Sequence, residues 1–83
     1  MLKQDIERTL LHKLLNLKII GSKHTSFDNL PKGFPKHLGK EVKETAKDLI
    51  KRQLLLSKHT SYGLEVSLNP QKIDEIEQII DEE

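Results

Sequence analysis

The sequence predicts a mainly α-helical domain that carries a small β-hairpin. Three patterns in its 83 residues support this fold class. Two segments, residues 2–18 and 38–53, place apolar side chains at the spacing of a helix that is buried on one side. Residues 64–68 alternate between apolar and polar side chains, as a half-buried strand does. A chain of this length is expected to form one domain around one modest core.

The first helix is predicted over residues 2–18. Its apolar side chains recur at spacings of four and three residues, and two further leucines widen the stripe: Leu2, Ile6, Leu10, Leu14 and Leu17, with Leu11 and Leu15. Gly21 follows, and glycine is suited to the end of a helix. Residues 21–37 contain two of the three prolines and two of the four glycines. We therefore expect a turn-rich connection there, with one helical turn within residues 26–30.

The second helix is predicted over residues 38–53, and its side chains fall into three stripes on a helical wheel. The buried side is expected to hold Leu38, Val42, Ala46, Leu49 and Gln53. A second stripe consists of Lys36, Lys40, Lys43, Lys47 and Lys51. The acidic side chains lie between the lysine stripe and the far edge of the buried side; they are Glu41, Glu44 and Asp48. The basic side chains are therefore gathered on one face of the helix.

A β-hairpin is predicted over residues 54–68. Residues 54–58 and 64–68 are expected to pair as antiparallel strands. The loop between them is predicted to span residues 59–63, which end with a glycine.

The last helix is predicted over residues 70–80. Asn69 is a preferred N-cap residue, and Pro70 is a preferred first helical residue. The acidic residues Asp74, Glu75 and Glu77 suit the N-terminal half of a helix, where the dipole favours negative charge. Four isoleucines give this helix an apolar face: Ile73, Ile76, Ile79 and Ile80.

The pentapeptide Ser-Lys-His-Thr-Ser occurs twice, at residues 22–26 and 57–61. Each copy follows an apolar stretch and precedes an aromatic residue, Phe27 or Tyr62. Two interpretations stay open. The copies form equivalent loops that touch the same kind of ligand, or the match is a coincidence between two polar connections. The elements expected around the two copies differ, which argues against an internal duplication.

The charges are divided unevenly along the chain. Residues 1–63 contain 13 Lys or Arg against 6 Asp or Glu, a net charge of +7, whereas residues 64–83 contain 1 Lys against 7 Asp or Glu, a net charge of −6. A basic body with an acidic end favours a polyanionic partner for the body. The alternative is a solvated, well-mixed surface whose last segment happens to be acidic.

The composition argues against several classes of protein. The chain has no cysteine, which excludes disulfides, thiolate zinc sites and thiol catalysis. The four histidines are spread out, and no glycine-rich phosphate loop is present. We therefore expect no enzymatic activity, no cofactor and no metal. No apolar run approaches the roughly 18 residues that a membrane span needs, and a cysteine-free chain suits a reducing compartment, so we expect a cytoplasmic protein without contact to a membrane.

One segment, KHLGKEVKETAKDLIKRQLLLSKHTSYGLEVSLNP, combines a helix that ends in a basic turn, a leucine run, a glycine-containing loop and an alternating strand. This combination resembles the small, archaeal-type winged helix-turn-helix DNA-binding proteins, and the resemblance covers about residues 26–70. It implies a winged helix-turn-helix fold with an added C-terminal helix. In that fold, residues 38–53 form the recognition helix, which enters the major groove of DNA, and residues 54–68 form the wing.

The resemblance implies a set of residues for DNA contact. On the helix side these are Lys36, His37, Lys40, Lys43 and Lys47, and at the wing they are Lys58, His59, Thr60 and Tyr62. Lysine binds phosphate as a point charge, while hydroxyls and imidazole suit phosphate and minor-groove contacts. Two roles are possible for the ring of Tyr62. It packs against a sugar of the DNA, or it folds back on the hairpin as a cross-strand anchor. The chain has only two arginines, Arg8 and Arg52, so few side chains can make the bidentate contact to guanine.

These observations predict a protein that binds double-stranded DNA, most simply a small transcriptional regulator. The alternative is a winged-helix module that binds another protein without contact to nucleic acid, because the fold alone does not decide function. The first and last helices carry more apolar surface than one short domain needs. We therefore expect a homodimer formed through these two helices, although the same surface can also pack within one chain.

Overall fold

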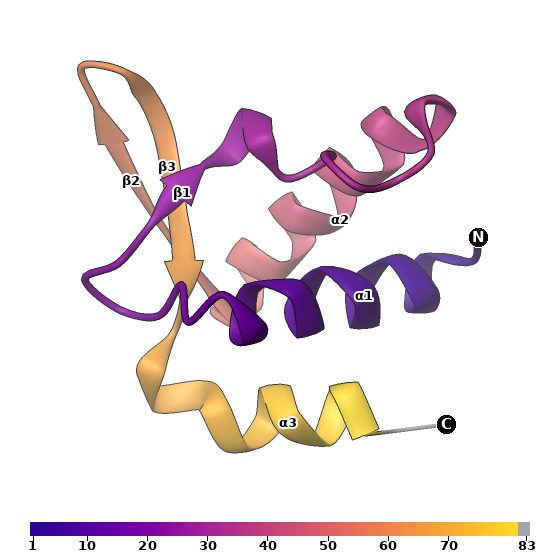
Figure 1. Ribbon diagram of the computed structural model, residues 1–83. Helices are drawn as coiled ribbons and strands as arrows, with labels where there is room; N and C mark the ends of the chain where they lie inside the picture. Colours follow the sequence, from indigo (N-terminus) through magenta and orange to yellow (C-terminus); the bar gives the residue numbers. More distant parts are fainter. Residues whose placement is uncertain (82–83) are drawn as a thin grey trace.

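The computed structural model describes residues 1–81 and has a mixed α/β fold; Glu82 and Glu83, the end of the acidic segment, lie outside the described residues. Within residues 1–81 there are three α-helices and one three-stranded antiparallel sheet (Figure 1). In chain order the elements are α1 (Lys3–Asn16), β1 (Thr25–Ser26), α2 (Gly39–Lys51), β2 (Leu55–Thr60), β3 (Gly63–Leu68) and α3 (Ile73–Asp81). Short 3₁₀ helices lie between them at Phe27–Asn29, Lys36–Leu38 and Pro70–Lys72.

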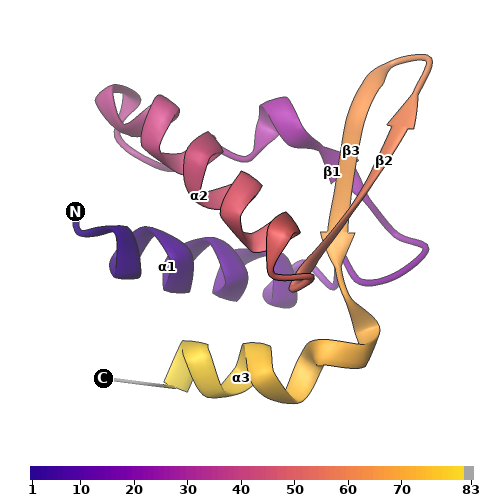
Figure 2. The same cartoon turned by 180° about the vertical axis from the view of Figure 1, so that it is seen from behind.

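The helix α1 lies between α2 and α3, and the sheet lies at one end of the three helices (Figures 1 and 2). A helix that packs on two sides needs a broad apolar surface, which explains the wide leucine stripe of α1. Its buried residues are Ile6, Leu10, Leu11 and Leu14. In α3, Ile76 is fully buried, and the other isoleucines pack against the core. Most of the apolar surface that favoured a homodimer is thus buried within one chain, and the homodimer stays a prediction.

The predicted hairpin forms, but its register differs by one residue from a pairing of residues 54–58 with 64–68. The strands β2 and β3 pair antiparallel, with Leu55 opposite Leu68. The strands extend further than expected, because residues 59–60 continue the ladder of β2. The loop therefore consists of residues 61–62, and the prediction of a loop over residues 59–63 was wrong.

A third strand, β1, was not predicted. It pairs antiparallel with β3 on the side opposite β2, with Thr25 opposite Val66. The sheet order is therefore β1-β3-β2, with β3 in the centre. A strand of two residues is too short for an alternating pattern, so nothing in the turn-rich residues 21–37 indicated it.

Both α1 and α2 end at a residue other than glycine in the left-handed conformation. Lys18 has a φ of 55° and Gln53 a φ of 62°. Each closes the last helical turn in the Schellman arrangement, with a backward hydrogen bond of 3.0 Å in both helices. Gly21, which was expected to end α1, is therefore not its cap. Gln53, which was expected on the buried side of α2, lies beyond the helix and is exposed.

Replacing Gln53 with glycine is expected to raise the free energy of unfolding by about 0.5–1 kcal/mol. The left-handed conformation costs a residue with a Cβ about 1–2 kcal/mol, and the greater chain entropy of glycine offsets part of this gain. The backbone carbonyl at this position, which accepts a hydrogen bond from Asn69, is kept. Urea unfolding followed by circular dichroism measures the change.

The matched control for this variant is Lys51→Gly, two residues earlier and still within α2. Glycine there is expected to lower the free energy of unfolding by about 1 kcal/mol, because the position is helical. If Gln53→Gly raises the free energy of unfolding and Lys51→Gly lowers it, backbone conformation is confirmed as the cause. A loss of stability in both variants would contradict it.

The predicted N-cap of the last helix is confirmed. The side-chain oxygen of Asn69 accepts a hydrogen bond from the backbone amide of Gln71 at 3.0 Å. The first turn, Pro70–Lys72, is 3₁₀, and α3 continues from it to Asp81. The acidic side chains of α3, namely Asp74, Glu75, Glu77 and Asp81, are all exposed.

Candidate nucleic-acid interface

The lysines of α2 lie mostly on the side of the helix that faces solvent. The buried side of α2 consists of Val42, Thr45, Ala46 and Leu49. On the opposite side Lys40, Lys47 and Lys51 are exposed, and we refer to these three residues as the lysine face. Lys36 and His37, which precede α2 in a 3₁₀ helix, are exposed as well. The predicted gathering of basic side chains is therefore present in the folded chain.

The acidic side of α2 is directed toward α1. Asp48 accepts a hydrogen bond from Arg52 at 3.1 Å and lies 3.8 Å from the ammonium of Lys3. Arg52 also donates to Glu7 of α1 at 2.6 Å. The hydrogen bond to Glu7 is the main cause that raises the pKa of Arg52 above its ordinary value, while burial acts in the opposite direction. These ion pairs join the two helices and keep the carboxylate of Asp48 away from the lysine face.

Lys43 differs from the lysine face, because it is half-buried and paired. Its ammonium donates to a carboxylate oxygen of Asp28 at 3.1 Å, in the 3₁₀ helix Phe27–Asn29. The Asp28 side chain is 82% exposed, so the pair is solvated and contributes little to stability. The charge of Lys43 is nevertheless partly compensated, unlike that of Lys47 one helical turn later.

The hairpin holds Lys58 and His59 on opposite faces of the sheet. His59 is opposite Leu64 and therefore shares a face with Val66, which is buried in the core beside α2. Lys58 is opposite Glu65 and shares the other face. Both side chains are exposed. The fold thus places His59 on the face of the sheet that carries the buried Val66, and Lys58 on the opposite face.

Glu65 is flanked by basic side chains from both neighbouring strands. It is the only acidic residue between Asp48 and Asp74. It forms an ion pair with His24, just before β1, and it faces Lys58 of β2 across the ladder. The single carboxylate of the hairpin is therefore hydrogen-bonded to His24 and lies opposite Lys58 within the sheet.

The two copies of Ser-Lys-His-Thr-Ser supply these flanking residues. The first copy, residues 22–26, ends in β1, and most of the second copy, residues 57–61, belongs to β2. Their registers differ, since Thr25 near the end of one copy and Ser57 at the start of the other are both opposite Val66. The copies are therefore not equivalent loops, but two segments on either side of the same central strand.

The tip of the hairpin is held by one threonine. The Oγ1 atom of Thr60 accepts a hydrogen bond from the backbone amide of Tyr62 at 3.1 Å and donates to the carbonyl of Gly63 at 3.0 Å. Gly63 has a φ of 115°, which suits glycine. The Thr60 hydroxyl hydrogen is thus used within the tip. Tyr62 is 94% exposed, so its ring does not fold back on the hairpin as a cross-strand anchor.

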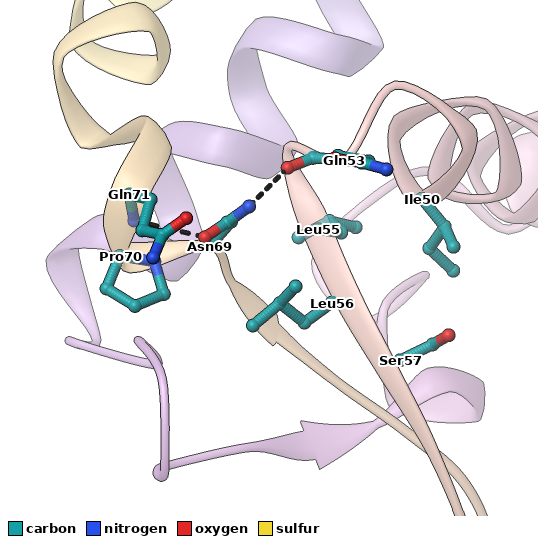
Figure 3. A pocket seen from close by; sticks show the side chains of 8 residues that line it. All are labelled: Ile50, Gln53, Leu55, Leu56, Ser57, Asn69, Pro70 and Gln71. Atoms are coloured by element: carbon teal, nitrogen blue, oxygen red, sulfur yellow. Dashed lines mark hydrogen bonds between the residues drawn. The ribbon is translucent and has the colours of Figure 1, made fainter.

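An open pocket of about 550 Å³ lies where α2 and β2 meet. These two elements form the arms of a V that joins between Lys51 and Leu55 (Figure 2). The pocket is lined by Ile50, Gln53, Leu55, Leu56, Ser57, Asn69, Pro70 and Gln71 (Figure 3). Leu56 is 41% exposed there. No sequence pattern indicated this pocket, because its lining combines residues 50–57 with the distant residues 69–71.

No protein-family model, curated protein or solved structure matches the chain. The function is therefore inferred from the geometry and charge of the fold. Among residues 1–81, no three His, Asp or Glu side chains converge as they would around a metal ion. None of the helices in that part of the chain is both long and apolar enough to cross a membrane.

Proposed function

We propose that this protein binds double-stranded DNA, with the lysine face of α2 against the phosphates and the β2–β3 hairpin beside it, as a winged helix-turn-helix domain. The observation that carries the proposal is the separation of charge on α2. Three exposed lysines line one side, and no ion pair within residues 1–81 involves them. Such a stripe releases condensed counterions when it binds a phosphate backbone, which favours association.

The connection of α2 to the hairpin supports this proposal. The helix leads into β2 without a long loop, so the lysine face and the hairpin are two arms of one V (Figure 2). The major groove is wide enough to admit an α-helix. With α2 in the groove, Lys36 and His37 extend the contact at its N-terminal end, and His59 and Tyr62 reach the DNA from the other arm. Lys58 is expected to contribute less, since it is turned to the far face of the sheet.

We further propose that one chain discriminates weakly between DNA sequences. Both arginines hold the fold together: Arg52 binds Glu7, and the Nε of Arg8 donates to the carbonyl of Ile79 at 3.3 Å. Neither is available for the bidentate contact to guanine that is the commonest specific contact in the major groove. A role as a transcriptional regulator then requires added specificity, which a homodimer on a palindromic site supplies.

The test is the salt dependence of binding to a labelled random duplex, measured by fluorescence anisotropy. The Lys47→Ala variant is expected to flatten the slope of log affinity against log salt by about 0.9, which is an affinity loss of about eight-fold near 0.1 M salt. Lys18→Ala is the matched control, because it removes the same charge from an exposed position at the end of α1. An unchanged slope in Lys47→Ala, or the same change in both variants, would overturn the proposal.

A protein-interaction module is the second candidate function. The open pocket between α2 and β2 favours it, because Ile50 and the exposed Leu56 offer an apolar surface there. This candidate predicts no salt-dependent binding to duplex DNA by the unmodified chain. The anisotropy titration therefore separates the two functions before any variant is made.

A further inference from the structure

Tyr62 projects from the hairpin tip without any packing partner. Its side chain is 94% exposed, more than any of the other exposed large apolar residues. Its neighbours at the tip, His59, Thr60 and Ser61, are polar. Residues that anchor a protein–protein contact are surrounded by side chains that exclude water from them. An isolated ring with a polar surrounding does not fit that description, but it has two flat faces open for stacking.

The backbone position of Tyr62 is set by the fold of the tip. Thr60 bonds to the backbone on both sides of the turn, and the strands behind it pair without interruption from Leu55 to Thr60. A tyrosine side chain has only two rotatable angles, so little conformational freedom is lost when it binds. The tip is thus organised for contact before a ligand arrives.

Residues 59–63 contain no acidic side chain, so a ligand with phosphates is not repelled at the tip. Glu65 is the acidic residue nearest in sequence to the turn, and it is already paired with His24. His59 is exposed and lies two positions before the first turn residue, Ser61. Exposed aromatic rings that stack on bases, together with basic groups along the backbone, are the means by which proteins hold unpaired nucleotides.

From these observations we infer that Tyr62 stacks on an unpaired nucleobase. The preferred ligand is then DNA in which a single-stranded segment adjoins the duplex held by α2; this inference rests on the proposed function. The six residues of β2 extend the tip on the order of 20 Å from the base of the V. The unpaired base is therefore expected several base pairs away from the centre of the α2 contact.

The experiment compares three DNAs: a short blunt duplex, the same duplex with a single-stranded overhang, and the same duplex with an abasic overhang. The chain has one tyrosine and no tryptophan, so tyrosine emission, corrected for absorption by DNA, reports on Tyr62 alone. We expect quenching by the overhang DNA and much less by the blunt or baseless forms. Tyr62→Ala is expected to weaken binding to the overhang DNA about ten-fold, which removes most of the preference for the overhang DNA over the blunt duplex. Tyr62→Phe keeps a ring that can stack and is expected to retain the preference.

The matched control at the tip is Ser61→Ala, which removes an exposed hydroxyl from the neighbouring position and is expected to change nothing. Equal affinity of Tyr62→Ala and the unmodified chain for the overhang DNA would overturn the stacking inference while leaving duplex binding intact. Equal quenching by the baseless overhang would overturn it as well, and would assign the ring to the sugar–phosphate backbone. Absence of binding to every DNA overturns both the inference and the proposed function.

Discussion

In the Asn69→Ala variant, the free energy of unfolding is expected to fall by about 2–3 kcal/mol, because one buried side chain holds three segments together. Its amide nitrogen donates to the carbonyl of Gln53 at 2.8 Å, at the end of α2, and its oxygen caps the amide of Gln71 (Figure 3). Asn69 is only 8% exposed. Alanine removes the cap and leaves the two partially buried backbone groups without this partner.

The controls for this prediction separate the hydrogen bond that caps the amide of Gln71 from the hydrogen bond to the carbonyl of Gln53. Asn69→Ser keeps an acceptor for the amide of Gln71 but is too short to reach Gln53, so it is expected to recover about 1 kcal/mol of the loss. Gln71→Ala keeps the backbone amide and changes an exposed side chain, so its effect is expected to stay within about 0.5 kcal/mol. Urea unfolding measures all three. An Asn69→Ala variant as stable as the unmodified chain would contradict the claim that these two hydrogen bonds stabilise the fold.

Removing the whole lysine face is expected to abolish most of the DNA affinity. The triple change of Lys40, Lys47 and Lys51 to alanine removes three phosphate contacts, so the slope of log affinity against log salt flattens by about 2.7. Near 0.1 M salt this is an affinity loss of about 10²–10³-fold. The fold is expected to persist, because all three side chains are exposed and alanine favours a helix.

The matched control for the lysine face removes the same net charge elsewhere, by changing Lys18, Lys23 and Lys72 to alanine. Its slope is expected to stay close to that of the unmodified chain, because none of the three lies on α2. Equal losses in both triple variants would indicate attraction by net charge alone. Binding that survives in the lysine-face variant would end the DNA proposal and favour the protein-interaction module.

Much of the fold could be predicted, because its signals lie within a few residues of one another. The spacing of Ile6, Leu10 and Leu14 indicates α1, and the alternation of Leu64 with Val66 indicates β3. The Asn69 cap is a local signal too. The ends of α1 and α2 were predicted less well. Lysine and glutamine carry no preference for the left-handed conformation that Lys18 and Gln53 adopt.

The candidate site could be predicted only in part. The lysine stripe is a property of one helix, so its periodicity was visible in the sequence and four of its five lysines are exposed. The placement of Lys58 and His59 on opposite faces depends on the register of β2 with β3, and the exposure of Tyr62 depends on the Thr60 hydrogen bonds at the turn. The position of that turn was missed by the sequence pattern.

The helices, the presence of the hairpin and the gathering of lysines on one face of α2 follow from local sequence patterns. Which charges stay available for a partner depends on how the elements pack together. Lys43 pairs with Asp28, which is 15 residues away in the sequence. Glu65 is hydrogen-bonded to His24, 41 residues away, and Arg52 pairs with Glu7, 45 residues away. Periodicity describes neighbours along one element, whereas these pairs form only when separate elements pack together. The lysine face is therefore defined as much by the partners that the fold gives to other charges as by the lysines themselves.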